Sequence, residues 1–331
     1  RPLVPPIPGL DTVPYLTNET LFENTQRPSH LIVIGGGPIG VEMAQAHRRL
    51  GAAVTIVEQA VLLPKDDPEL VDVVRAQLLR EGVTILEGAS LKRVDKTPAG
   101  VAATVERGGA PVVIAGSHLL LAVGRKANVE ALNLDAAGVK LGPRGIETSA
   151  QLKSSNRKVY AIGDVNGRFP FTHAAGYHAG IVLRNALFRL PAKVDDRAMP
   201  WVTYTDPELA QAGLTEAAAR AQHGQVTALR WPFHDNDRAQ AERRTEGFAK
   251  VVLDKAGRIL GASIVGANAG EVVQPWCLAI ANGMKISAMA GLVAPYPTLG
   301  EINKRVAGSY FTPKLFNERT RKIVRFLLRL G

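Results

Sequence analysis

Apolar and polar positions follow a strand, helix and strand order near the start of the chain. The apolar run at 31–34 is followed by apolar positions at helical spacing over 41–50 and by a second apolar run at 54–57. Short apolar runs indicate buried parallel strands, and a spacing of three or four residues indicates a helix packed against them. The pattern therefore predicts one βαβ unit.

Similar patterns divide the rest of the chain. A helix at 68–81 and strands at 83–87, 101–105, 112–114 and 119–123 predict a Rossmann-like α/β domain with an inserted β-meander. A buried strand is predicted at 159–162 and a helix at 174–187. After residue 199, strands at 202–205, 226–231, 248–253 and 259–265 and helices at 216–223, 271–282 and 286–292 predict an α+β domain. Residues 1–30, rich in proline at their start, are expected to be an extended linker without its own core.

Glycines occupy the turn between the first predicted strand and helix, in the spacing GxGxxG. The residues of this turn are Gly35, Gly36, Gly37, Pro38, Ile39 and Gly40. The first glycine of the spacing allows a sharp turn, the second lets the backbone approach a pyrophosphate, and the third lets helix and strand pack closely. The N-terminus of the helix then faces the anion, so the turn predicts a dinucleotide site.

A carboxylate follows the second predicted strand. Glu58 lies eighteen residues after Gly40, where it can accept hydrogen bonds from both ribose hydroxyls and would repel a 2′-phosphate. The sequence therefore favours NAD(H) over NADP(H).

Composition excludes several classes of protein. The 331 residues contain one cysteine, Cys277, so disulfide scaffolds and cysteine-based metal sites are excluded, and no metal site is predicted. No run of eighteen apolar residues occurs, and the first thirty residues lack the pattern of a secretory signal. We therefore expect a cytoplasmic protein.

The net charge of +10 is concentrated at the C-terminal end. From residue 304 onward the chain contains eight Lys and Arg and a single acid, Glu318, which gives a local charge of +7. Arg321, Arg325 and Arg329 share one helical face, and Ile323, Val324, Leu327 and Leu328 share another. This basic amphipathic helix is expected either to pack on its own domain or dimer partner, or to touch an acidic membrane surface or partner protein. No nucleic-acid-binding motif is present, so nucleic acid is not an expected partner.

Several motifs follow one another in a fixed order along the chain. They are the linker at 1–9, the turn from Gly35 to Glu42, Ala122-Val123-Gly124-Arg125 with Asn128, Ala161-Ile162-Gly163-Asp164, Thr172-His173-Ala174-Ala175, Tyr204-Thr205-Asp206-Pro207-Glu208 and Tyr296-Pro297-Thr298-Leu299-Gly300-Glu301. In this order they resemble the motifs of the flavin-dependent pyridine nucleotide–disulfide oxidoreductases, the family of dihydrolipoyl dehydrogenase, glutathione reductase and mercuric reductase.

The resemblance implies a division into domains. Residues 1–28 would be a linker from a FAD-binding segment outside this sequence, 29–145 the NAD-binding domain and 146–198 the remaining part of the FAD-binding domain. Residues 199–318 would form a C-terminal α+β dimerisation domain and 319–331 a basic tail. The family's first FAD glycine motif and its Cys-x4-Cys redox pair are not in this sequence, so the chain is expected to be a fragment that is inactive alone.

The resemblance also implies roles for single residues. Asp164, beside Gly163, would hold the ribityl chain of FAD, and Thr172 and His173 would line the isoalloxazine ring. Gly124 would leave room beside the nicotinamide nucleotide, and Glu42 would pair with a lysine that this chain lacks. For Asp164 a helix N-cap, and for Glu42 a surface ion pair, remain open alternatives.

Tyr296 departs from the pattern of the disulfide reductases, which place a histidine before the Pro-Thr pair. A phenol is a poor general base at neutral pH, but it can donate a hydrogen bond or help to bind a metal. Mercuric reductase also carries tyrosine here, so Tyr296 and Glu301 favour that branch as catalytic residues, although the vicinal cysteines that end mercuric reductase are missing. A packing role for Tyr296 remains an alternative.

Together these features predict a homodimeric, mercuric-reductase-like oxidoreductase. Hydride would pass from NADH to FAD and on to a redox disulfide outside this sequence, with a small molecule or a metal ion as the final acceptor. One alternative is a disulfide reductase of the dihydrolipoyl dehydrogenase type. Another, from a different class, is a nucleotide-binding, membrane-associated interaction module.

Overall fold

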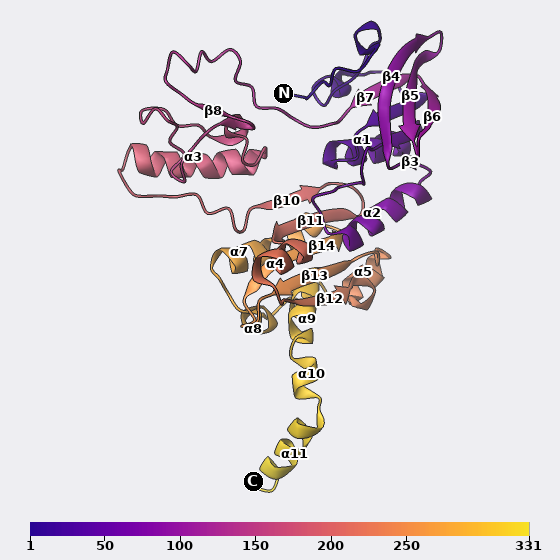
Figure 1. Cartoon of the computed structure of the whole chain (residues 1–331). Helices are drawn as coiled ribbons and strands as arrows, with labels where there is room; N and C mark the ends of the chain where they lie inside the picture. Colours follow the sequence, from indigo (N-terminus) through magenta and orange to yellow (C-terminus); the bar gives the residue numbers. More distant parts are fainter. Residues whose placement is uncertain (331) are drawn as a thin grey trace. The chain divides into compact units, whose positions relative to one another are not determined.

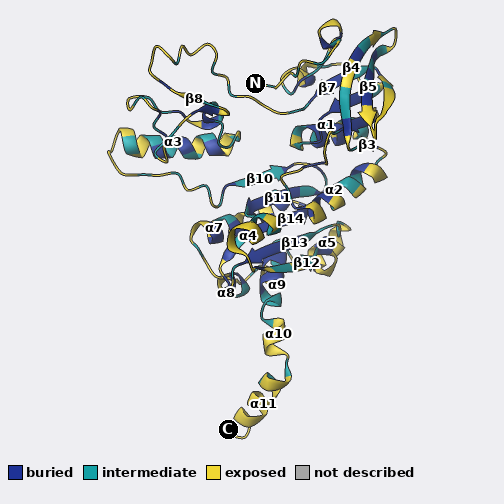
Figure 2. Ribbon diagram, in the orientation of Figure 1, coloured by how far each residue is buried: buried dark blue, intermediate teal, exposed yellow. Residues whose placement is uncertain are grey.

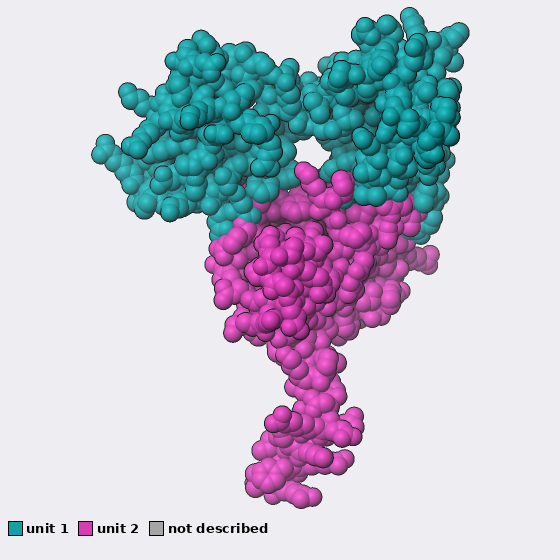
Figure 3. All heavy atoms as spheres, in the orientation of Figure 1, with its two compact units in different colours: residues 1–63, 78–196 teal, residues 64–77, 197–331 magenta. Residues whose placement is uncertain are grey.

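The computed structural model describes residues 1–330, and the chain forms two compact units (Figure 3). The first unit contains residues 1–63 and 78–196, and the second contains residues 64–77 and the chain from 197 onward. Gly331, which ends the predicted tail 319–331, lies outside the described residues.

The first unit contains a four-stranded parallel sheet in the order β3-β2-β1-β7, and Figure 1 shows α1 beside it. Its strands are β1 (His30–Ile34), β2 (Ala53–Val57), β3 (Thr84–Leu86) and β7 (His118–Leu121), and the helices between them are α1 (Pro38–Arg49) and α2 (Pro68–Arg80). Leu31, Ile32 and Val33 are fully buried, because parallel strands are covered on both faces. The predicted βαβ unit is confirmed.

The inserted meander is an antiparallel sheet of three strands, β4 (Ala89–Thr97), β5 (Gly100–Arg107) and β6 (Ala110–Gly116). The sequence predicted β5 and β6 but missed β4. The charged residues Lys92, Arg93 and Asp95 interrupt its apolar pattern. An irregular register between Leu91 and Arg93 also breaks the alternation of apolar and polar positions along the strand.

The first thirty residues contribute to the core of the first unit, which corrects the expectation of an extended linker. Two short 3₁₀ helices, η1 (Leu10–Thr12) and η2 (Leu21–Glu23), bury Leu10 and Leu21. Leu10 and Val13 belong to the same apolar cluster as the strands of the meander. The backbone of Leu16 also bonds to Leu119 and Leu121, so this segment pairs with β7.

The remainder of the first unit contains two short strands, a 3₁₀ helix and a long helix. These are β8 (Leu141–Gly142), β9 (Gly145–Ile146), η3 (Gly163–Asn166) and α3 (Thr172–Ala186). The buried strand predicted at 159–162 is wrong, since only an isolated bridge joins Tyr160 to Lys153, and Ile162 is exposed. The amide of Ala161 bonds to Leu152 instead, so this segment closes on its own neighbours and joins no sheet.

The second unit is built on a five-stranded antiparallel sheet in the order β10-β11-β14-β13-β12. The strands are β10 (Pro200–Thr203), β11 (Glu208–Gly213), β12 (Thr227–Pro232), β13 (Phe248–Leu253) and β14 (Ile259–Gly266). Its helices are α4 (Glu216–His223), η4 (Phe233–Asp235), α5 (Asp237–Glu242), α6 (Ala269–Val272), α7 (Gln274–Ala281), α8 (Ile286–Ala290), α9 (Glu301–Ser309), α10 (Thr312–Leu315) and α11 (Glu318–Leu327). The predicted α+β domain is confirmed, although β11, η4, α5, α9 and α10 were not predicted.

Trp276, fully buried on α7, anchors the core of the second unit. Its ring nitrogen donates to Asn303 Oδ1 at 2.7 Å, and Asn303 donates in turn to the carbonyl of Val272. The pair satisfies two polar side chains in an apolar core. The helix predicted at 271–282 is divided into α6 and α7 at Val273, just before Pro275.

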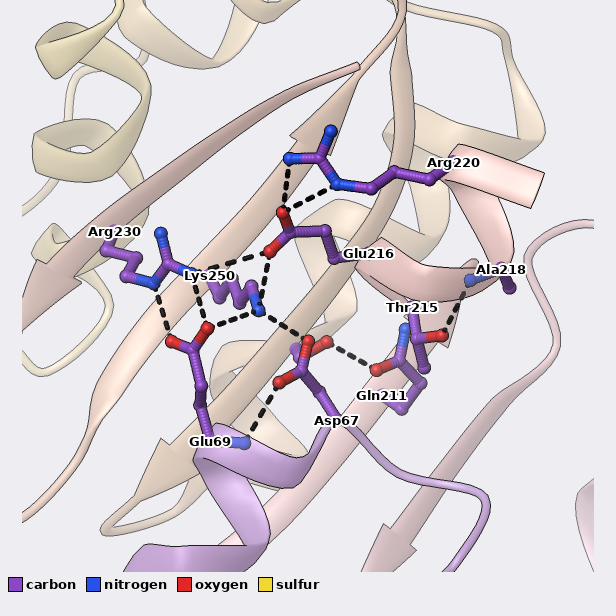
Figure 4. Close-up of polar contacts among 10 residues, drawn as sticks. Asp67, Glu69, Gln211, Thr215, Glu216, Ala218, Arg220, Arg230 and Lys250 are labelled. Atoms are coloured by element: carbon purple, nitrogen blue, oxygen red, sulfur yellow. Dashed lines mark hydrogen bonds and ion pairs between the residues drawn. The ribbon is translucent and has the colours of Figure 1, made fainter. Parts of the chain in front are cut away.

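A buried ion cluster lies on this sheet, centred on Lys250 of β13, whose side chain is 2% exposed (Figure 4). Its Nζ lies 2.6 Å from Asp67 Oδ2, 2.8 Å from Glu216 Oε2 and 3.1 Å from Glu69 Oε1. Arg230 also binds Glu69, with 2.7 Å between Nε and Oε2. The cluster fixes the segment before α2 to the sheet of the second unit.

The charges in this cluster shift one another's pKa values. Burial alone would lower the pKa of Lys250, but hydrogen bonds to Asp67, Glu216 and Glu69 outweigh it and raise that pKa. The hydrogen bond from Arg230, opposed by burial and aided by Lys250, lowers the pKa of Glu69 to about 2. The hydrogen bond from Lys250 is the main cause of the lowered pKa of Glu216. These shifts keep Lys250, Glu69 and Glu216 charged at neutral pH.

Candidate functional site

The glycine turn lies between β1 and α1. The structure shows at each of its glycines what a side chain would meet. Gly35 has a φ of +110°, and a Cβ there would come 2.5 Å from the carbonyl oxygen of Ala122. A Cβ on Gly40 would come 1.9 Å from the carbonyl oxygen of Gly35. Both positions therefore exclude a side chain for reasons internal to the fold.

Gly37 differs from these two, because a Cβ there would meet no atom within 4 Å. It is also the N-cap of α1, with extended backbone angles and no side-chain cap, and Pro38 follows at the first turn. The start of α1 thus combines an open position at Gly37 with an uncapped helix N-terminus, an arrangement that suits an anion. The turn fits the pyrophosphate of a dinucleotide.

Glu58 follows β2 and lies against this turn. Its Oε2 accepts a hydrogen bond from the amide of Gly36 at 2.6 Å, and its Oε1 accepts one from the amide of Ala60 at 2.7 Å. A Cβ on Gly36 would come 2.6 Å from Leu62 Cδ2 and 3.0 Å from Glu58 Cγ. Glu58 therefore braces the glycine turn, a role that spacing along the sequence did not reveal.

Two other predicted residues lie on α1. Ile39 and Glu42 occupy its first turns, and both are half-buried. The structure places Glu42 on the helix that the glycine turn opens, as expected, and its role stays a prediction.

Gly124 and Asp164, separated by forty residues, are brought together through Arg125. Gly124 has a φ of +132° and open space at its Cβ position. The Nη2 of Arg125 lies 2.8 Å from Asp164 Oδ2, and the Asp164 side chain is 43% exposed. Asp164 is the second residue of η3, whose N-cap is Ile162, so Asp164 is not that helix's N-cap. Its carboxylate is held in place, yet open to a polyol hydroxyl.

His178 of α3 holds the backbone beside Asp164, and the sequence did not indicate it. The ring is fully buried, and its Nδ1 accepts a hydrogen bond from the amide of Gly163 at 3.1 Å. Burial, the largest cause, lowers the pKa of His178, so the ring is neutral with its proton on Nε2. A histidine on the apolar face of the predicted helix at 174–187 was the available signal.

Thr172 and His173 open α3, and both are exposed. The His173 ring stacks on Phe171 with 5.2 Å between ring centroids and 9° between planes. Ala175 of the same helix approaches Gly163, with its Cβ 3.0 Å from the Cβ position of that glycine. The predicted flavin-side residues Gly163, Asp164, Thr172 and His173 thus occupy one short stretch of the first unit.

Tyr296 and Glu301 belong to the second unit. Tyr296 is 69% exposed, and its hydroxyl donates to Asp237 Oδ2 at 2.9 Å. That hydrogen bond is the main cause of the raised pKa of Tyr296, so the phenol keeps its proton and acts as a donor rather than a base. Such exposure is inconsistent with a core packing role within this chain.

Glu301 starts α9 and pairs with Arg305, with 2.8 Å between Oε1 and Nη2. Between Tyr296 and Glu301 the chain lines a cavity of about 510 Å³, together with Asn268 and Arg238. Among the described residues, no group of three or more His, Cys, Asp and Glu side chains could hold a metal ion. Cys277 is half-buried, and burial raises the pKa of its thiol.

The parallel sheet, its glycine turn and the carboxylate beside it define a Rossmann-like α/β fold. Residues 1–179 match the family described as pyridine nucleotide-disulphide oxidoreductase, and residues 199–307 match the dimerisation domain of the same family. The chain therefore belongs to the pyridine nucleotide-disulphide oxidoreductases, as the order of its motifs indicated.

Relatives at similar identity come from both branches of the family that the sequence left open. The mercuric reductase of Bacillus cereus is 38% identical over 300 residues, which are 90% of this chain and 48% of that protein. The dihydrolipoyl dehydrogenase of Bacillus subtilis (strain 168) is 35% identical over 284 residues, 85% of this chain and 60% of that protein. The chain spans about half the length of the mercuric reductases of Bacillus cereus and Staphylococcus aureus.

Solved structures agree with this assignment. The HOCl-induced flavoprotein disulfide reductase RclA from Escherichia coli superposes with a TM-score of 0.85 at 28% identity, covering 93% of this chain and 71% of that one. Its Cu(II) complex superposes equally well, at 27% identity over 93% of this chain and 72% of that one.

Proposed function

We propose that this chain supplies the NAD(H)-binding and dimerisation parts of a homodimeric, FAD-dependent oxidoreductase that resembles mercuric reductase and works in the cytoplasm. The proposal keeps the domain limits 29–145, 146–198 and 199–318. The observation that carries it is the open position at Gly37, at the uncapped start of α1, with Glu58 beside it. The names of the relatives and of the superposed flavoproteins support the flavin and the two candidate acceptors.

In this proposal the residues of the first unit bind and orient the cofactors. The amides at the start of α1 hold the pyrophosphate of NADH, and Gly124 leaves room for the nicotinamide nucleotide. Asp164, fixed by Arg125 and by the bond from Gly163 to His178, holds a hydroxyl of FAD. FAD, when bound, accepts two electrons from the nicotinamide and passes them on.

Glu58 is proposed to select NADH over NADPH, which a charge reversal tests. Glu58→Arg should weaken NADH binding and strengthen NADPH binding, each by about tenfold or more, because the 2′-phosphate would meet a cation instead of a carboxylate. Isothermal titration of both nucleotides against the chain measures this change.

Glu58→Gln is the matched control for this experiment, since it keeps the length of the side chain and one acceptor for the turn. It should reduce the discrimination against NADPH without reversing it, and thermal unfolding measured in parallel reports any loss of the brace on Gly36. Equal binding of NADH and NADPH by the unmodified chain would remove the role given to Glu58.

Tyr296 is proposed to donate a hydrogen bond at the acceptor site, with Glu301 nearby. Tyr296→Phe in the full-length protein should slow turnover with the acceptor by about tenfold, as expected for the loss of one hydrogen bond, and leave reduction of the flavin by NADH unchanged. Asp237→Asn should have a smaller effect, because the phenol keeps a partner. Steady-state turnover and single-turnover flavin reduction distinguish these steps, and a slower flavin reduction in Tyr296→Phe would place the residue elsewhere in the mechanism.

A disulfide reductase of the dihydrolipoyl dehydrogenase type is the second candidate, favoured by relatives at 35% and 36% identity. The two functions predict different acceptors for the full-length protein. Reduction of lipoamide with NADH would support this candidate, and reduction of Hg(II) without activity on lipoamide would support the first.

A further inference from the structure

The last helix, α11 (Glu318–Leu327), is an unusual surface element of the second unit. None of its residues is buried, and Figure 2 shows it exposed along its length. Ile323, Leu327 and Leu328 are 50%, 56% and 75% exposed, and Phe316 just before the helix is 75% exposed. An apolar surface of this kind on a described helix indicates an interaction surface.

The charged residues of α11 also follow a regular pattern along the helix. Between Glu318 and Leu330 five Lys and Arg accompany one acid, and Arg321, Arg325 and Arg329 recur every four residues on one face. Ile323 and Leu327 lie on the opposite side with Val324 next to them, and Leu328 and Arg329 follow the last residue of the helix, Leu327. The side chain of Asn317 caps the helix by accepting a hydrogen bond from the amide of Thr320 at 3.0 Å, so the amphipathic arrangement begins at a defined start.

The balance of charge indicates what this surface binds. Residues from 304 onward carry a net charge of +7, which leaves +3 for residues 1–303. A second copy of the chain therefore offers no excess of negative charge to a basic helix, and two α11 helices side by side would repel each other. A helix with a basic face and an exposed apolar face instead fits a surface that carries negative charge on its outside and has an apolar layer beneath that charge.

We propose that α11 binds the surface of an anionic lipid bilayer, lying in the plane of the headgroups with Ile323, Val324, Leu327 and Leu328 inserted and its Arg residues against the lipid phosphates. Among the described residues, no helix is long and apolar enough to cross a membrane. This surface contact does not depend on the nucleotide site and would hold the oxidoreductase at the cytoplasmic leaflet, which carries the negative lipids.

Flotation of the chain with lipid vesicles tests this proposal. Vesicles of phosphatidylcholine with about one third phosphatidylglycerol should carry the chain to the top of the gradient, and vesicles of phosphatidylcholine alone should not. The triple variant Arg321→Gln, Arg325→Gln, Arg329→Gln should lose binding by on the order of a hundredfold, at roughly fivefold for each cation removed. High salt should weaken binding of the unmodified chain in the same direction.

A second variant distinguishes insertion of the apolar face from electrostatic attraction of the basic face. Val324→Asn with Leu327→Asn keeps every cation but should also release the chain from vesicles, because the apolar face can no longer insert. NADH binding by the first unit and tryptophan fluorescence from the second unit should stay unchanged in both variants, which shows that the chain remains folded. Unchanged flotation after deletion of 317–331 would overturn the proposal, and so would a dimer that dissociates to monomers on that deletion while vesicle binding is absent throughout.

Discussion

Replacement of Gly37 by alanine should leave the first unit folded and remove most of its affinity for NADH. The new methyl group meets no protein atom within 4 Å, and the backbone there is extended, so the free energy of unfolding should change by less than about 0.5 kcal/mol. The same methyl group would occupy the space that the pyrophosphate needs. We expect NADH binding to weaken by about tenfold or more, measured by isothermal titration.

Gly40→Ala is the matched comparison and should act in the opposite way. Its Cβ would come 1.9 Å from a backbone oxygen of Gly35, so α1 and β1 would have to separate. We expect a loss of about 3 kcal/mol or more in stability, seen as faster hydrogen exchange of the β1 amides. If Gly37→Ala bound NADH normally, the open space before α1 would not be the pyrophosphate site.

Lys250→Ala should destabilise the second unit by about 3–5 kcal/mol, because it leaves the carboxylate of Asp67, 3% exposed, buried without its cation. Urea unfolding followed by tryptophan fluorescence measures this loss. All three tryptophans of the chain, Trp201, Trp231 and Trp276, lie in the second unit, so the signal reports on that unit alone.

The double variant Lys250→Met with Asp67→Asn is the control for this prediction. It removes both charges and keeps the volume, so it should recover more than half of the loss. Measured beside the single variants Lys250→Met and Asp67→Asn, it gives the coupling energy between the two sites. Equal losses of stability in the single and double variants would mean that the two charges contribute nothing and that Lys250 stabilises the unit only through packing.

The cluster should also make the second unit sensitive to acid. The folded pKa of Glu69 is about 2, below its usual value of 4.5, so its contribution is present above pH 4.5 and is lost as the pH falls toward 2. The lowered pKa of Glu216 acts in the same direction. Lys250→Met should reduce this loss of stability in acid but not abolish it, because it removes the main cause of the lowered pKa of Glu216 while Arg230 still lowers that of Glu69.

The parallel sheet and the glycine turn could be predicted because their signals are local. Apolar runs specify β1, β2 and β7, and the glycine spacing specifies the turn. The strand β4 was missed because its residues are charged and its register is irregular, and the strand predicted at 159–162 has no neighbouring strand to pair with. A run of apolar residues indicates burial, and only tertiary contacts decide whether it joins a sheet.

The candidate site likewise combines residues that the sequence could indicate with contacts that it could not. Glu58 was found from its spacing, but its bonds to Gly36 and Ala60 depend on how β2 ends against the turn. The hydrogen bond from Gly163 to His178 joins residues fifteen apart. The position of His178 on the apolar face of a predicted helix indicates burial, but it does not indicate this partner. Lys250 was detectable in principle, since a lysine inside the apolar run of β13 requires a buried partner.

Reduction of the bound flavin in the full-length gene product tests the central proposal most directly. Under anaerobic conditions we expect NADH to bleach the flavin absorbance with about one equivalent, and NADPH to do so at least about tenfold more slowly. A full-length protein that binds no flavin, or whose flavin neither nucleotide reduces, would contradict the assignment of this chain to an NADH-dependent flavoprotein oxidoreductase.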